Sequence, residues 1–127
     1  MTGSDHNIHL ARPYDDAGNF HGARLLVDHI WPRGISKDDL ALDAWVKEVA
    51  PSDDLRRWFD HDPDKWSEFR NRYMSELKDN RDAVDECLDW VRKGTVTLLF
   101  AARDRDHNNA VVLRDYLKLV LRNSKSS

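Results

Sequence analysis

The chain has 127 residues, of which 34% are charged and 40% are hydrophobic, and its net charge is −3. This length fits one domain with a single core and excludes two ordinary domains. The acidic balance argues against a dedicated nucleic-acid binder, which usually carries a strong basic excess, although residues 103–125 alone carry a charge of +3.

Cys87 is the single cysteine, so the chain forms no intrachain disulfide and no thiolate zinc cluster. Residues 1–9 are polar and lack the apolar core of a signal peptide. No run approaches the roughly 18 apolar residues that a membrane helix needs. We therefore expect a cytoplasmic protein without a membrane partner, while the sequence leaves cofactors and oligomeric state open.

The first half of the chain predicts two short strands and a helical turn. Residues 8–11 alternate between apolar and polar, which is typical of a strand, and a turn cluster follows at 15–19. Residues 25–27 are continuously apolar, which suits a strand buried on both faces. Residues 36–39 resemble a capping box that opens a short helix.

The segment 42–49 can be interpreted in two ways. Its apolar residues have helical spacing, but its position just before Pro51 also suits a strand. We favour the strand and keep the helix as the alternative.

The second half predicts four helices and one further strand. Ser52 is the expected cap of a helix over 53–59, and Asp62-Pro63 opens the next helix. The apolar stripe of that second helix consists of Trp66, Phe69, Tyr73 and Leu77. The remaining elements are a helix over 81–92 that stops at Gly94, a strand over 95–100 and a last helix over 109–121.

Strand-then-helix order with buried strands implies parallel pairing and helices on both faces of the sheet. We therefore expect a small three-layer α/β domain with a mostly parallel sheet flanked by helices. It should span residues 1–127 as one domain, with 1–7 and 123–127 as frayed ends.

Two loops, 28–34 and 101–109, leave the carboxyl ends of predicted buried strands, where open parallel sheets bind their ligands. Their arginines offer planar forks that suit a carboxylate or phosphate, and their histidines titrate near neutral pH. The last predicted helix begins where free backbone N–H groups favour an anion. The candidate catalytic residues are Asp28 and His107, and the candidate ligand-binding residues are Trp31, Arg33, Arg103, Asp104, Asn108 and Asn109.

Each of these residues also has a plain structural interpretation. Asn108 can simply cap the last helix, and the two arginines can pair with Asp28 or Asp104. Trp31 can be a lid over the core, and the histidines can be ordinary loop residues. No recognised ligand spacing supports a metal site built from Asp28, His29, Asp104 and His107, so we assign no metal.

The block Trp31-Pro32-Arg33-Gly34, together with 25–30, 97–104 and 107–110, resembles the YeaO-like proteins, bacterial members of domain of unknown function 488. The resemblance covers nearly the whole chain. Related branches carry a Cys-His-Arg element where this chain has His107-Asn108-Asn109, so the resemblance does not bring thiol chemistry with it. His29 stands where the commoner form has arginine, which weakens any essential role for that position.

Two functional hypotheses follow. The first is a small-molecule enzyme or enzyme-like domain that binds an anionic ligand, a nucleotide or a phosphorylated metabolite, at the carboxyl end of the sheet. The second is a non-catalytic nucleic-acid-binding or regulatory module that uses the basic C-terminal face, with Trp31 as a stacking platform. A closed crevice between the two loops favours the first hypothesis, and an open basic face favours the second.

Overall fold

The computed structural model describes residues 7–125, which form a four-stranded parallel sheet in the order β1-β4-β2-β3. The strands are β1 (Ile8–Ala11), β2 (Ala23–Leu26), β3 (Ala44–Trp45) and β4 (Val96–Leu99). The central pair, β2 and β4, is parallel, and all four residues of β4 are buried. The prediction of two parallel strands in the sheet interior is therefore confirmed.

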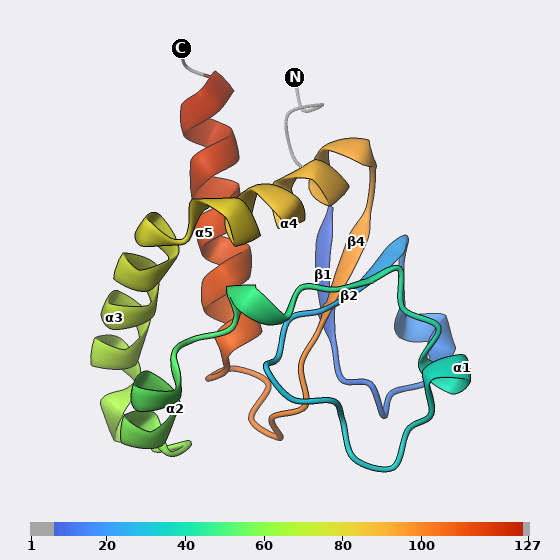
Figure 1. The fold of residues 1–127 in the computed structure, drawn as a ribbon, viewed down its shortest axis with the longest axis horizontal. Coiled ribbons are helices and arrows are strands. Elements are labelled where there is room, and N and C mark those ends of the chain that lie inside the picture. Colours follow the sequence, from blue (N-terminus) through green and yellow to red (C-terminus); the bar gives the residue numbers. More distant parts are fainter. Residues whose placement is uncertain (1–6, 126–127) are drawn as a thin grey trace.

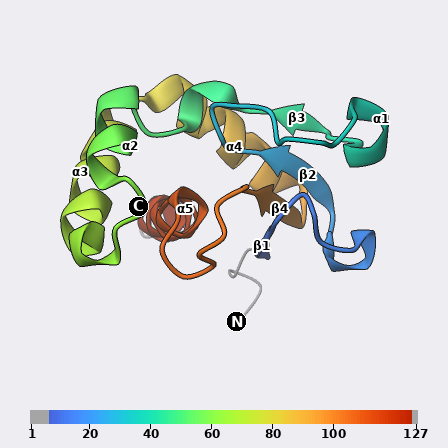
Figure 2. The same cartoon turned by 90° about the horizontal axis from the view of Figure 1, so that it is seen from below.

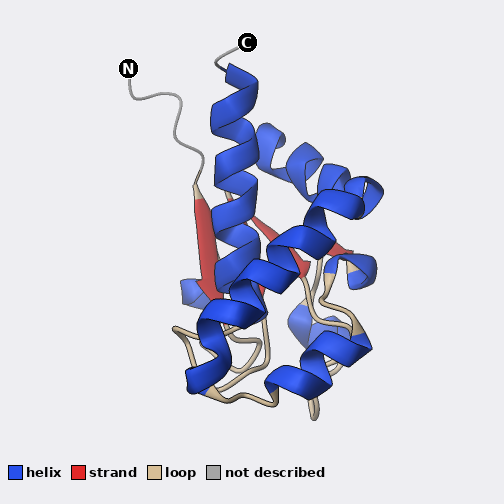
Figure 3. Cartoon of the chain, turned by 90° about the vertical axis from the view of Figure 1, so that its left-hand side faces the viewer, coloured by secondary structure: helices blue, strands red, loops and turns tan. Residues whose placement is uncertain are grey.

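The helices are α1 (Lys37–Leu40), α2 (Asp53–Phe59), α3 (Trp66–Asp79), α4 (Arg81–Lys93) and α5 (Asn109–Lys125). Helices α2, α3 and α5 lie on one side of the sheet and α1 on the other (Figure 2). Figure 3 shows the molecule from the side of α2, α3 and α5, with the helices in front of the strands. Both predicted serine caps are present, because Ser36 Oγ accepts from Asp39 N and Ser52 Oγ accepts from Leu55 N.

Successive residues of the central strands face two cores of unequal size. Leu25 and Leu98 belong to the larger core beneath the long helices, whereas Leu26 and Leu99 belong to a smaller one. The smaller core is closed by Leu40 of α1 and by the loops around it. The three-layer α/β domain is therefore confirmed, with one outer layer reduced to a single helical turn and loops.

The segment 42–49 contains only the two-residue strand β3, followed by a 3-10 turn at Lys47–Val49. Leu42 and Trp45 pack in the smaller core, whereas Val46 and Val49 are buried in the larger core. The favoured strand is therefore correct only at 44–45. The apolar spacing looks helical because the chain crosses the edge of the sheet from one core to the other.

The predicted stripe of α3 faces the core, with Phe69, Tyr73 and Leu77 buried and Trp66 partly exposed. Cys87 lies on the buried face of α4, and its burial raises the pKa of the thiol to about 12. Such a thiol stays protonated at neutral pH and is a poor nucleophile.

The expected frayed ends fall partly outside the described residues, at 1–6 and 126–127. At the described positions, Asn7 O accepts from Val96 N, and residues 123–125 belong to α5, which continues to Lys125. In the described part of the chain, no helix has the length and apolar character needed to cross a membrane.

Candidate functional site

A cavity of about 730 Å³ opens at the carboxyl edge of the sheet. In Figure 1, β1 and β4 run downward to this edge. The loops after β1, β2 and β4 line it on the sheet side, and residues of α2 and α3 line it on the helical side. All of the candidate site residues except Asp104 line this one cavity. The two predicted loops thus share one crevice because β2 and β4 are neighbours.

Through hydrogen bonds, the Asp28 side chain links the ends of β2 and β4 to the start of α5. Its Oδ2 accepts from Ala101 N at 2.8 Å, and its Oδ1 accepts from Asn109 Nδ2 at 3.1 Å. Burial raises the pKa of this carboxyl group, although both hydrogen bonds act in the opposite direction. Its backbone oxygen also accepts from Trp45 Nε1. Both carboxylate oxygens are engaged, so the geometry makes Asp28 a positioning residue.

Asp104 lies outside the cavity lining and orients His107. One carboxylate oxygen accepts from the backbone N–H groups of Asp106 and His107, and the other lies 2.9 Å from His107 Nδ1. These contacts lower the pKa of Asp104, and the hydrogen bond from the Asp106 backbone contributes most. The imidazole also packs edge-on against Trp66, with ring centroids 5.1 Å apart. No described residue bonds the other ring nitrogen, Nε2.

The side chains of Asn108 and Asn109 are already used within the protein. Asn108 is 2% exposed; its Oδ1 accepts from Val111 N and its Nδ2 donates to Asp104 O. Asn109 Nδ2 donates to Val27 O as well as to Asp28. Asn108 therefore has the geometry of a helix cap, as its structural interpretation states.

Trp31 also matches its structural interpretation while it lines the cavity. Its Nε1 donates to Ile35 O at 2.7 Å, and its ring meets Trp45 edge-on at 5.5 Å. The ring packs against the smaller core as a lid. Trp31 is only partly exposed, at the surface that lines the cavity.

Arg33 and Arg103 line the cavity with guanidinium groups that have no partner among the described residues. Both side chains are exposed, and neither guanidinium makes a hydrogen bond or an ion pair with any residue in 7–125. The interpretation that pairs them with Asp28 or Asp104 is wrong, because those carboxylates bond to Ala101, Asn109 and His107 instead.

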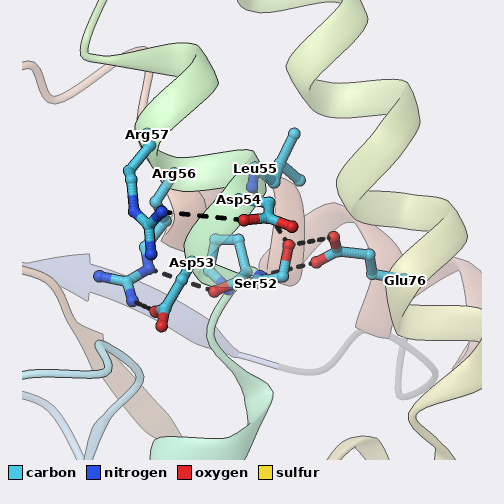
Figure 4. A network of polar contacts seen from close by, with 8 residues as sticks. Ser52, Asp53, Asp54, Leu55, Arg56, Arg57 and Glu76 are labelled. Carbon is cyan, nitrogen blue, oxygen red and sulfur yellow. Dashed lines mark hydrogen bonds and ion pairs between the residues drawn. The ribbon is translucent and has the colours of Figure 1, made fainter.

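Two further arginines line the cavity and were not identified from the sequence. Arg12 follows β1 and donates from Nε and Nη2 to Ala101 O, at 3.3 and 2.9 Å. Arg56 of α2 donates from Nε to Pro51 O and pairs with Asp53 (Figure 4). Both guanidinium groups are anchored, in contrast to those of Arg33 and Arg103.

His61 is another cavity residue that sequence reasoning missed. Helix α2 ends at Phe59, and the next two residues, Asp60 and His61, have left-handed φ values of 47° and 55°. This turn brings the His61 ring into the cavity, 6.4 Å from the Phe59 ring. The turn contains no glycine that would have marked it in the sequence.

The described residues that line the cavity form no recognisable metal centre. Among residues 7–125, no three or more histidine, cysteine, aspartate or glutamate side chains come together as metal ligands would. Asp28 and Asp104 instead make the hydrogen bonds described above.

Comparison with known proteins shows relatives along almost the entire chain. The family model described as the inactive DUF488-N3 subclade matches residues 7–127. Uncharacterized protein YeaO of Escherichia coli (strain K12) is 42% identical over 112 residues, which cover 88% of this chain and 97% of that protein. Uncharacterized protein Rv3073c of Mycobacterium tuberculosis (strain H37Rv) is 41% identical over 110 residues, 87% of this chain and 92% of that protein. No solved structure matches the chain. The chain belongs to the YeaO-like DUF488 family, in its DUF488-N3 branch.

Proposed function

We propose that this protein is an enzyme-like domain that binds a small phosphate-bearing anion in the cavity at the carboxyl edge of the sheet. The observation that carries the proposal is the pair of unpartnered guanidinium groups, Arg33 and Arg103, on one cavity. A guanidinium presents a planar fork of donors that matches a phosphate or carboxylate, and such charge-assisted bonds are strong.

The charge of the cavity supports the same conclusion. Four arginines and one aspartate line it, which gives a net charge of +3 with the histidines neutral. The whole chain carries −3, so the charge of the cavity lining is opposite in sign to that of the chain as a whole. A cleft lined by charges of one sign attracts ligands of the opposite charge and raises their local concentration. The single acid, Asp28, has both oxygens engaged and leaves the cationic character of the cavity in place.

Binding without turnover fits the chain better than catalysis. The matching family model is described as an inactive subclade. Among the described residues that line the cavity, none is a cysteine, serine or threonine that could act as a nucleophile. His107 can contribute a hydrogen bond through Nε2, with its ring held by Asp104.

The nucleic-acid alternative has less support, because part of the positive charge on α5 is neutralised. Arg114 Nε lies 3.2 Å from one carboxylate oxygen of Asp115, and Arg70 of α3 lies 3.4 Å from the other. Arg114 is therefore not a free cation on this face, although the net charge of +3 for residues 103–125 already includes Asp115.

Calorimetric titration with inorganic pyrophosphate tests the proposed function. The wild-type protein should bind it, and Arg33→Lys and Arg103→Lys should each weaken binding by about tenfold, because lysine keeps the charge but loses the fork. Arg92→Lys is the matched control, since Arg92 lies exposed in the last turn of α4 outside the cavity. Thermal melting checks that all three variants fold. Absence of wild-type binding at millimolar pyrophosphate, or equal affinity in all variants, would overturn the proposal.

A further inference from the structure

The cavity is larger and more apolar than a phosphate ion alone requires. Its 730 Å³ lie within the range of about 300–1,000 Å³ that pockets for organic ligands occupy. Apolar side chains supply much of its wall, among them Ile30, Pro32, Pro51, Phe59 and Phe69. An inorganic anion would gain nothing from this wall, so the ligand should carry a less polar body attached to its anionic group.

The helical side of the cavity is built from aromatic rings. Phe59 and Phe69 stack with centroids 4.2 Å apart, and both are nearly fully buried. The His61 ring lies tilted against Phe59, and the His107 ring packs edge-on against Trp66. The two imidazoles thus extend this aromatic cluster into the cavity. These two rings, unlike the buried phenylalanines, have exposed surface that a ligand can cover.

The two unpartnered arginines and His61 come from opposite sides of the cavity, whereas Arg56, the cation on the helical side, is paired with Asp53. Arg33 follows β2 and Arg103 follows β4, on the sheet side, whereas His61 follows α2. A ligand that satisfies both sides needs an anionic group at one end and a planar ring at the other. A flat ring stacks on imidazole or phenyl surfaces, and His107 Nε2 can bond to its edge.

We propose that the ligand is a nucleoside phosphate, whose phosphate lies between Arg33 and Arg103 and whose base lies against His61. This inference rests on the proposed function, because it adds a base to the same anion site. It separates nucleotides from phosphorylated sugars, which present the same phosphate without a planar ring.

The test compares AMP with ribose 5-phosphate, which has the same sugar and phosphate but no base. AMP should bind about tenfold more tightly, the fold-change that stacking of one base commonly gives. In His61→Asn, AMP should bind only as well as ribose 5-phosphate, while ribose 5-phosphate should bind as it does to the wild type. Asparagine is chosen because it tolerates the left-handed backbone at position 61.

His9→Ala is the matched control, because His9 is exposed in β1 outside the cavity and should leave both affinities unchanged. Equal affinity of the wild type for AMP and ribose 5-phosphate would overturn the nucleoside inference and leave the anion site intact. Failure of the wild type to bind either compound or pyrophosphate would overturn the proposed function itself. An undiminished preference for AMP in His61→Asn would also contradict the placement of the base.

Discussion

The two loops that border the cavity are built in different ways. The β4–α5 loop, residues 100–108, is fixed along its length by Asp28, Asp104 and Asn108. The β2–α1 loop, residues 27–36, is held at its base by Asp28 and near its end by the bond from Trp31 to Ile35. Its tip is open, with Ile30 66% exposed.

This difference suggests a division of roles between the loops. The β4–α5 loop sets the position of the His107 ring and the start of α5, so the proposed ligand would meet groups that are already in place. In the β2–α1 loop, Tyr14 OH donates to Arg33 O and holds the backbone, while the guanidinium remains unpartnered. A loop anchored in this way can close its charged side chain onto an anion without a change of fold.

Asp28 joins both loops, so its replacement should have the largest effect on stability. In Asp28→Asn, the side chain keeps its shape but has one acceptor where two N–H donors need one each. We expect a loss of about 1–3 kcal/mol in the free energy of unfolding, measured by urea titration. Asp16→Asn is the control, because Asp16 is exposed in the 15–19 turn and its side chain has no partner among the described residues. Equal losses in both variants would contradict the role of Asp28.

The cap of α5 should be the next most sensitive point of the fixed loop. Asn108→Ala removes the acceptor for Val111 N and the donor to Asp104 O. Loss of a cap of this kind costs about 0.5–2 kcal/mol, which thermal or urea unfolding can resolve. A variant as stable as the wild type would show that the β4–α5 loop does not depend on this cap.

Two aspartates near the cavity should respond to pH in opposite directions. Burial raises the pKa of Asp28, so the stability it contributes is complete below about pH 4 and falls as pH rises through the raised pKa. The hydrogen bond from Arg105 lowers the pKa of Asp15, so its contribution is complete above about pH 4 and falls as pH drops through the lowered pKa.

Unfolding between pH 3 and pH 7 measures this contrast. The stability difference between wild type and Asp28→Asn should shrink as pH rises, whereas the difference between wild type and Asp15→Asn should grow. The same trend in both variants would refute the opposite pKa directions.

The open tip should be the least sensitive part. Ile30→Ser removes an apolar side chain that is 66% exposed, and we expect a stability change within about 0.5 kcal/mol. A loss several times larger would show that the tip is packed in solution and that the two loops are equally fixed.

The central strands were predictable from the sequence because their physical signal is local. Residues 25–27 and 98–100 are continuously apolar, which is favourable only in a strand covered on both faces. The segment 42–49 could not be assigned, since its apolar residues serve two different cores. No local sequence pattern indicates where the chain crosses the edge of a sheet.

The candidate site was predictable in part for the same reason. Arg33 and Arg103 follow buried strands, so their common edge could be inferred before the strand order was known. Arg12 was missed because its place depends on the pairing of β1 with β4, which the sequence does not show. His61 was missed because its position depends on a left-handed turn formed without glycine.

An experimental structure of the protein with inorganic pyrophosphate bound would test the central claim most directly. The account predicts an anion between the Arg33 and Arg103 guanidinium groups, each bonded to phosphate oxygens, with the β4–α5 loop unchanged. The two guanidinium groups should then lie within about 8 Å of each other, the screening length at physiological salt. Pyrophosphate bound elsewhere, or guanidinium groups held farther apart on both sides of an empty cavity, would contradict it.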